Sequence, residues 1–384
     1  MEPVTHLLTG ACLSRAGLNR RAAYATLTMV VAAEFPDIDT LWSVRGPIEG
    51  FQHHRGITHT FLGLPFEAAL IVVGVYAWHR WRVRQASAHA RVNAKPLTAA
   101  PVRWGVLYGL ALVALLSHLL LDYTNNYGLR PFFPFNDRWY AASIVFIFDP
   151  LMFALLLGAL VAPWLFGLVS AEVGAKKQPF RGRGWAIAAL LSVVGWWGLR
   201  TVEHQQAVQM AMAQSIVAPA PASATDSVQV PDAEAVDVPS YLPARKALAS
   251  PYLLSPFRWS TVMDFGPVYR LAEIDTQGGT VTMGETTYPK PGRSAAVLAA
   301  EQSKLGRVYM DWSPMPFVEV TKPDSELVSE GGEPGAVGTV VTFRDPRFLE
   351  GRLGDAGRQP LVGIVELAAG DRVVRETMDG REEP

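Results

Sequence analysis

The chain has 384 residues, of which 49% are hydrophobic and 18% are charged, and its formal net charge at pH 7 is −1. This balance excludes the concentrated basic surface that a nucleic-acid partner requires. The single cysteine, Cys12, excludes an intrachain disulfide framework and a cysteine-based metal cage. Long apolar runs lie before residue 203 and most acidic residues follow it, so at least two unlike domains are expected.

The N-terminal region carries two short apolar stretches, residues 5–16 and 21–35, joined by Gly17-Leu18-Asn19. The chain starts without a basic segment and reaches His6 early, so no cleavable signal peptide is expected. Each stretch is shorter than the roughly 20 residues that a spanning helix needs. We predict a helical hairpin that dips into the bilayer or packs on spanning helices.

Four further apolar runs predict about four membrane-spanning helices, at residues 60–81, 102–121, 150–169 and 185–202. The third has a favourable start, because Asp149 is a good N-cap and Pro150 suits the first helical position. The fourth is shorter and carries Arg200 near its end, where the long side chain can reach the interface. Insertion into the membrane is expected to depend on these internal segments.

Basic residues orient the predicted bundle. The loop after the first span and the loop after the third are basic, through Arg80, Arg82, Arg84, Arg91, Lys95 and Arg103, and through Lys176, Lys177, Arg181 and Arg183. The positive-inside rule makes both loops cytoplasmic. We therefore expect a multi-pass protein of the inner cell membrane, with the C-terminal half outside the cytoplasm if residues 185–202 cross.

The second half of the sequence has the composition of a soluble region. After a membrane domain at residues 1–202, residues 203–251 are expected to form a helix and a linker rich in proline and alanine. Short β-favouring runs then recur at residues 259–263, 268–274, 280–283, 307–312, 339–343 and 361–367. They predict a small β-rich domain at residues 252–384, an antiparallel sheet or barrel. This region has no histidine and no catalytic motif.

Histidines and aspartates gather where the orientation places the external face. The first span begins after His59, the second ends at His118 and Asp122, and the third begins at Asp149. The two ends of the hairpin meet at the same level. The predicted metal ligands are His6, Asp37, Asp39, His54, His59, His118 and Asp122.

The residue types in this group suit a divalent metal. His118 and Asp122 are four residues apart, so they project from one face of a helix. Imidazole and carboxylate together favour zinc, with manganese or iron as alternatives. A bound ion would lower the pKa of a coordinated water to about 7. Asp39 or Asp149 could then act as the catalytic general base.

Simpler roles stay open for each residue taken alone. His118 could be a hydrogen-bonded packing residue, and His54 an exposed loop residue. Asp37 and Asp39 could end a helix and form a turn, and Asp149 could be only an N-cap. Convergence of all these side chains at one membrane face is the argument for metal.

The ordered motifs resemble a known family, the YdjM-type, LexA-regulated membrane-bound metal-dependent hydrolases. The resemblance covers about residues 1–170 and rests on the following motifs: Pro3-Val4-Thr5-His6, Phe35-Pro36-Asp37-Ile38-Asp39, His54-Arg55-Gly56-Ile57-Thr58-His59, Ser117-His118-Leu119-Leu120-Leu121-Asp122, Tyr127-Gly128, Pro134-Phe135, Arg138-Trp139 and Phe148-Asp149-Pro150. It implies an integral membrane protein and a hydrolase of unassigned reaction. The motif order is also distantly similar to the zinc-dependent phospholipase C and P1 nuclease group. The N-terminal tryptophan ligand of that group is absent, since this chain begins Met1-Glu2-Pro3.

Three functions follow as hypotheses. The first is metal-assisted hydrolysis at the external membrane face, on a phosphoester or lipid-linked substrate that Arg55, Arg130 or Arg138 could help to hold. The second is cation or proton transport through Glu67, His118 and Asp122. The third is a membrane-anchored scaffold whose C-terminal domain does the binding.

Overall fold

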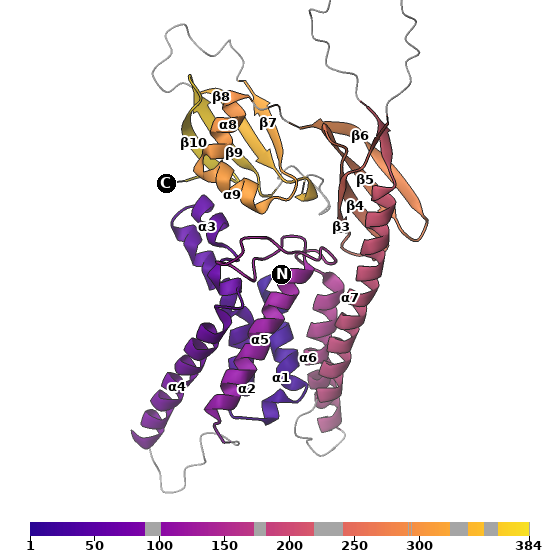
Figure 1. The fold of residues 1–384 in the computed structure, drawn as a ribbon. Coiled ribbons are helices and arrows are strands. Elements are labelled where there is room, and N and C mark those ends of the chain that lie inside the picture. The colour runs from indigo at the N-terminus through magenta and orange to yellow at the C-terminus, as the bar shows by residue number, and fades with distance from the viewer. Residues whose placement is uncertain are drawn as a thin grey trace, which may run out of the picture.

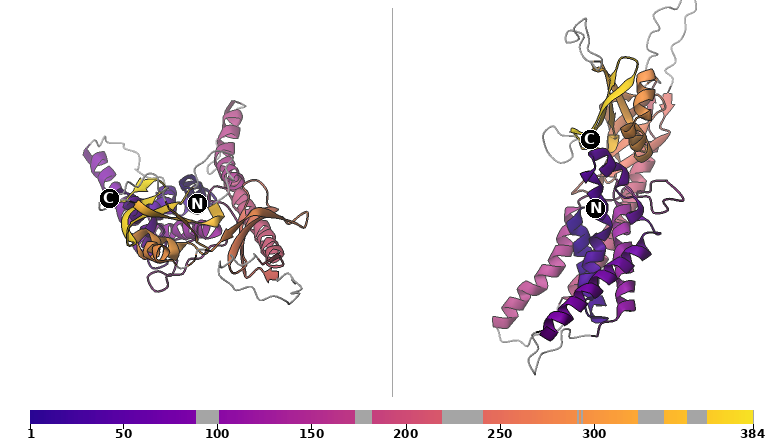
Figure 2. Two further views of the ribbon diagram at one scale, coloured as in Figure 1. Left: turned by 90° about the horizontal axis from the view of Figure 1, so that it is seen from above. Right: turned by 90° about the vertical axis from the view of Figure 1, so that its left-hand side faces the viewer.

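The computed structural model describes residues 1–88, 101–172, 182–218, 241–290, 292, 294–322, 337–348 and 360–383. Helices form the first half and strands most of the second (Figure 1). The helices make an elongated bundle, and the sheets lie beyond one end of it, as the right-hand view of Figure 2 shows. The N-terminus lies at the end of the bundle that faces the sheets (Figure 1).

The expected N-terminal hairpin is present as α1 (Pro3–Arg15) and α2 (Ala25–Glu34), joined through η1 (Leu18–Arg20). Gly17 makes the turn with φ 136°, which side-chain-bearing residues rarely adopt. The two helices pack closely, because a Cβ on Gly10 would lie 2.7 Å from the carbonyl oxygen of Met29. This close packing brings His6, near the start of α1, to the same end of the bundle as the residues that follow α2.

The longer helices support two or three membrane spans, so the predicted four are not confirmed. Among the described residues, α5 (Trp104–Thr124) and α7 (Arg183–Met212) are long and apolar enough to cross. Helix α4 (Leu64–Ala88) qualifies only as a pair, Pro47–His59 with Leu64–Ala86, which is bent by 85°. Its second half carries arginines that lower its hydropathy. Helix α6 (Pro150–Glu172) has an apolar part, Pro150–Phe166, that is shorter than a candidate membrane span.

The bundle has two apolar cores. Helices α2, α4 and α5 share the first, which includes Met29, Ile71 and Leu115. Helices α1, α6 and α7 share the second, which includes Cys12 and Met152. Alanines recur in both cores and allow helices to approach closely. Since α1 also contacts α5, the two cores form one continuous bundle.

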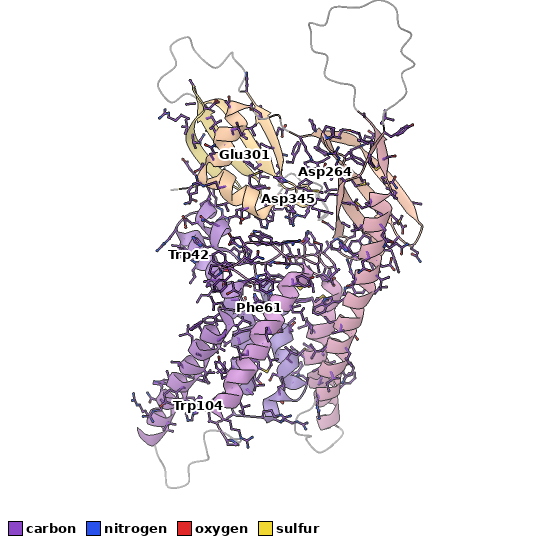
Figure 3. All side chains as sticks on the ribbon, viewed as in Figure 1. Trp42, Phe61, Trp104, Asp264, Glu301 and Asp345 are labelled. Atoms are coloured by element: carbon purple, nitrogen blue, oxygen red, sulfur yellow. The ribbon has the colours of Figure 1, made fainter. Side chains whose placement is uncertain are left out.

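A layer of short helices connects α2 to α4 at the end of the bundle near the sheets. It consists of η2 (Phe35–Val44), α3 (Pro47–His53) and η3 (Ile57–His59). In Figure 3, Trp42 and Phe61 mark this layer, and Trp104 marks the opposite end of the bundle. Most of the predicted metal ligands lie in this layer or in the last turns of α5.

The C-terminal half contains three antiparallel sheets. The first sheet pairs β1 (Ser215–Val217) with β2 (Tyr241–Pro243). The second has four strands in chain order: β3 (Lys246–Pro251), β4 (Arg258–Asp264), β5 (Val268–Asp275) and β6 (Thr280–Pro289). The third has five strands in the order β11-β10-β9-β8-β7: β7 (Phe317–Thr321), β8 (Val337–Arg344), β9 (Gly363–Ala368), β10 (Arg372–Met378) and β11 (Arg381–Glu382). A β-rich C-terminal part is therefore confirmed, as several sheets and not one.

One predicted strand is wrong. Residues 307–312 belong to α9 (Lys304–Trp312), which follows α8 (Ala295–Gln302). Ser303 caps α9 by accepting a hydrogen bond from the amide of Gly306. Leu305, Tyr309 and Trp312 are buried at the spacing of one helix face. The apolar residues therefore follow the helical period and not the alternation expected of a strand.

The two halves of the chain pack together. Helix α7 runs past the predicted domain boundary at residue 202 to Met212, and its last turns share a core with Trp259 and Met263 of β4. Elsewhere Trp312 of α9 contacts Phe51 of α3 and Tyr127. Of the predicted linker at 203–251, residues 219–240 lie outside the described residues.

Candidate metal centre

Four predicted ligands converge at the junction of α5 and the connecting layer. Asp37 comes from η2, His59 ends η3, and His118 and Asp122 lie on consecutive turns of α5. One donor atom from each lies within 4.8 Å of all the others. His59 Nε2 and His118 Nε2 are 3.1 Å apart, and Asp122 Oδ2 is 3.2 Å from the first and 3.5 Å from the second. We call these four residues the ligand cluster.

Hydrogen bonds fix the ring orientation of both histidines. His118 Nδ1 lies 2.7 Å from the carbonyl oxygen of Ala33, which can only accept, so Nδ1 donates. His59 Nδ1 lies 3.1 Å from Asp39 Oδ2 and is the natural donor there. Each Nε2 is then left to bind a metal ion, as in histidines that bind metal through Nε2, or to carry a proton in the metal-free protein.

The two oxygens of Asp122 have different environments. Oδ1 accepts a hydrogen bond from Arg55 Nη2 at 2.8 Å and also contacts the amino group of Met1. Oδ2 is buried, accepts no hydrogen bond, and faces the two Nε2 atoms. A buried carboxylate oxygen without a partner is costly. Lone pairs from two imidazoles and this oxygen therefore meet around a point that requires positive charge, and a metal ion fits that requirement.

Asp37 supplies the fourth side of the cluster. Its Oδ1 lies 3.4 Å from His59 Nε2 and 3.6 Å from His118 Nε2. In the metal-free protein, burial raises the pKa of Asp37, but hydrogen bonding with a protonated His59 and the nearby charge of His118 outweigh it and hold the pKa at about 2. Asp37 is thus ionised at neutral pH, the form that binds metal.

Asp39 holds the surrounding residues in place. Its Oδ2 accepts hydrogen bonds from the Arg55 amide at 2.8 Å and from Thr58 Oγ1 at 3.0 Å, and its Oδ1 lies 3.1 Å from His54 Nδ1. Burial raises the pKa of Asp39, but hydrogen bonding with His54 and His59 lowers it well below its usual range. Asp39, Asp37 and His54 also form a second group that could hold an ion.

His6 lies beside the ligand cluster without joining it. Its ring stacks on that of His118 with centroids 3.8 Å apart. Its Nε2 is 3.0 Å from the Met1 nitrogen and 3.5 Å from Asp122 Oδ1, the oxygen that faces away from the two Nε2 atoms. The structure therefore places His6 as support behind Asp122.

Asp149 lies apart from the ligand cluster and serves as a helix cap. Its Oδ1 accepts hydrogen bonds from the amides of Leu151 and Met152, both at 3.0 Å, and its Oδ2 accepts one from Trp196 Nε1 at 3.0 Å. Both oxygens of Asp149 are therefore engaged, Oδ1 in capping α6 and Oδ2 in joining α6 to α7. The N-cap interpretation of Asp149 accounts for these contacts.

Arg55 is central to the geometry, although the sequence suggested for it either a solvated surface position or a phosphate-binding role. Its guanidinium is buried, donating to Asp122, to Asn125 Oδ1 at 3.2 Å and to the Gly128 carbonyl at 2.7 Å. Its backbone has φ 55°, a left-handed conformation that is uncommon for non-glycine residues. The following Gly56 cannot carry a side chain without strain, because a Cβ would lie 2.8 Å from the His53 carbonyl oxygen. The position of Arg55 between His54 and His59 was the available signal.

Comparison with known proteins identifies the family of the region that contains this site. Residues 1–207 match the YdjM inner membrane protein family, and this region holds every residue of the ligand cluster. The uncharacterized protein YfhP of Bacillus subtilis (strain 168) is 26% identical over 175 residues, covering 44% of this chain. The chain spans about half of that relative, since 47% of YfhP is covered. No solved structure matches, and the similarity to the phospholipase C and P1 nuclease group finds no support. With its apolar helices, this membrane protein belongs to the YdjM inner membrane protein family.

Proposed function

We propose that the protein is a metal-dependent hydrolase whose ion is held by Asp37, His59, His118 and Asp122. The observation that carries this proposal is the Oδ2 atom of Asp122, which accepts no hydrogen bond and is buried against the two Nε2 atoms. Two imidazoles and two carboxylates suit zinc best, with manganese or iron as alternatives. When bound, such an ion supplies hydroxide at neutral pH by acidifying a coordinated water.

His54 is the proposed general base. Its Nδ1 faces Asp39 Oδ1 at 3.1 Å, so Nδ1 carries the proton and Nε2 is free to accept one. The His54 side chain is 27% exposed, whereas Asp39 is 3% exposed, so the histidine is the member of the pair that a water can reach. Asp39 then orients the ring and stabilises the imidazolium that forms, as a carboxylate does in other histidine–carboxylate pairs.

The site is proposed to lie at the external membrane face of a multi-pass protein. The support is the charge pattern: Arg80, Arg82 and Arg84 lie in the half of α4 that is remote from the ligand cluster. The positive-inside rule assigns that end of the bundle to the cytoplasm. Attaching a cysteine-reactive, membrane-impermeant reagent to a cysteine introduced at exposed Leu254 tests this sidedness in intact cells.

A panel of phosphomonoesters, phosphodiesters and carboxylic esters tests the activity of detergent-purified protein. We expect hydrolysis of a phosphoester that stops on treatment with a chelator and returns with zinc. Turnover that persists in the chelated protein would refute a metal-dependent mechanism. His53→Gln is the matched control variant, because His53 stacks on Trp42 outside the cluster, with ring centroids 4.2 Å apart.

A further inference from the structure

A cavity of about 570 Å³ lies between the connecting layer and the C-terminal half. Its size is in the range of sites for small molecules. Phe51, Phe146 and Ile147 line it from the helical half, and Phe348 and Leu361 line it from the β-rich half. The cavity is therefore a shared feature of both parts of the chain.

The wall of the cavity includes neighbours of the ligand cluster, although none of the four cluster residues lines it. His54, the proposed base, and Arg55, which holds Asp122, are both part of its wall, as is Met1. The remaining wall is largely apolar. A molecule that filled this space would have a polar group beside the metal centre and an apolar group against the aromatic side chains.

Helix η2 links the cavity to the membrane interface. A 3₁₀-helix has three residues per turn, so residues three apart share a face. Asp37 of the ligand cluster lies on the same face as Thr40 and Ser43, which line the cavity. The next face carries three apolar residues that are exposed by 46%, 64% and 85%: Ile38, Leu41 and Val44.

An exposed apolar face on a membrane protein, at the level where the bundle ends, is typical of a segment that lies in the bilayer interface. The same short helix thus presents apolar side chains outward and the cavity wall inward. An amphiphile in the outer part of a bilayer would lie next to this helix, close to the cavity.

We propose that the substrate is an amphiphilic phosphoester whose head lies at the metal centre and whose single hydrocarbon tail lies in this cavity. The inference rests on the proposed hydrolase function and names its substrate class. It also gives the C-terminal half a role, because that half supplies one wall of the tail site. For a probe that binds from water, each methylene added to the tail should strengthen binding about fourfold until the cavity is full.

The test uses the full chain in phosphatidylcholine nanodiscs and alkyl phosphates of four, eight and twelve carbons, each with a photoreactive diazirine at the tail end. We expect the longer probes to label peptides that contain Phe51, Phe348 or Leu361. Labelling confined to the membrane-facing surfaces of α4 to α7 would overturn the proposal. A twelve-carbon probe with a trimethylammonium head should label the cavity at least tenfold less, and equal labelling would overturn the phosphoester head.

Two matched pairs of variants separate the cavity from its surroundings. Thr40→Trp fills the cavity from η2, whereas Leu41→Trp adds the same side chain to the outward face. Leu253→Trp fills the cavity from the opposite wall. Its control is Leu254→Trp, at a residue that is 83% exposed. Only the first member of each pair should reduce labelling, by at least tenfold. Equal labelling in both members of both pairs would overturn the tail site.

Metal content distinguishes failure of this inference from failure of the proposed function. All four tryptophan variants should retain the metal of the unmodified protein. Cavity labelling in a protein that binds no metal would leave the tail site standing and refute the hydrolase. A metal-loaded protein without cavity labelling would leave the proposed hydrolase standing and refute the tail site.

Discussion

Arg55 donates a hydrogen bond from Nη2 to Oδ1 of Asp122 at 2.8 Å, and this contact turns the other carboxylate oxygen toward His59 and His118. The guanidinium is itself held by Asn125 and by the carbonyl of Gly128. It also lies over the ring of Tyr127, with 4.8 Å between Cζ and the ring centroid. Arg55 therefore helps to determine how Asp122 faces the proposed metal site.

Replacing Arg55 should weaken metal binding without removing any proposed ligand. In Arg55→Gln, Asp122 loses its guanidinium partner and keeps its contacts with the Met1 amino group and Asn125, so its carboxylate is held less firmly toward the two imidazoles. Partners of this kind typically contribute 10- to 100-fold to metal affinity, so a loss of about that size is expected in competition with a zinc-binding dye. Arg45→Gln is the control, since Arg45 is an exposed residue of the same layer. Unchanged affinity in Arg55→Gln would show that Asp122 needs no such support.

His54→Gln should separate catalysis from metal binding. Loss of a general base lowers turnover by about 10²- to 10⁴-fold. Because His54 is assigned to proton transfer, the purified variant should keep its metal content. If the variant instead lost metal, His54 would be a ligand, in the second group with Asp37 and Asp39. His53→Gln should change neither quantity.

The stability of the chelated protein should depend on pH through Asp37. The pKa of Asp37 in the folded protein is about 2, below its ordinary value near 3.9. A depressed pKa contributes stability that is present above the ordinary value and is lost as the pH falls through the folded value. The destabilisation caused by Asp37→Asn should therefore be complete above about pH 4 and shrink toward pH 2. Thermal unfolding at several pH values measures it, and a difference that grows on acidification would contradict the assigned charge.

Trp312 should be important for docking the C-terminal half. It is 2% exposed, and its Nε1 donates to the carbonyl oxygen of Tyr127 at 3.3 Å. It also packs on Phe51 and Phe348. Removing a buried aromatic side chain costs about 3 to 5 kcal/mol, so Trp312→Ala should unfold at lower denaturant concentration and expose the second half to protease. Leu254→Ala should behave as the unmodified protein, and similar behaviour of both variants would argue against a docked interface.

The convergence of ligands was predictable because membrane orientation constrains which helix ends meet. His59 precedes one apolar run, and His118 and Asp122 end the next, so two antiparallel helices bring them to one end of the bundle. Other features depend on tertiary contacts that the sequence does not display. Asp149 looked like a base because it lies at the same level, but α7 supplies Trp196 to its free oxygen. The strand expected at 307–312 is a helix because Ser303 caps it and Trp312 is buried on its inner face.

The central claim is that the ligand cluster binds a metal ion, and elemental analysis of protein purified in detergent without chelator tests it most directly. We expect at least one equivalent of metal, zinc foremost, in the unmodified protein and in His53→Gln. The folded double variant His118→Ala, Asp122→Ala should contain less than a tenth of that amount. Full metal content in the double variant, or no metal in the unmodified protein even after incubation with zinc, would contradict the account.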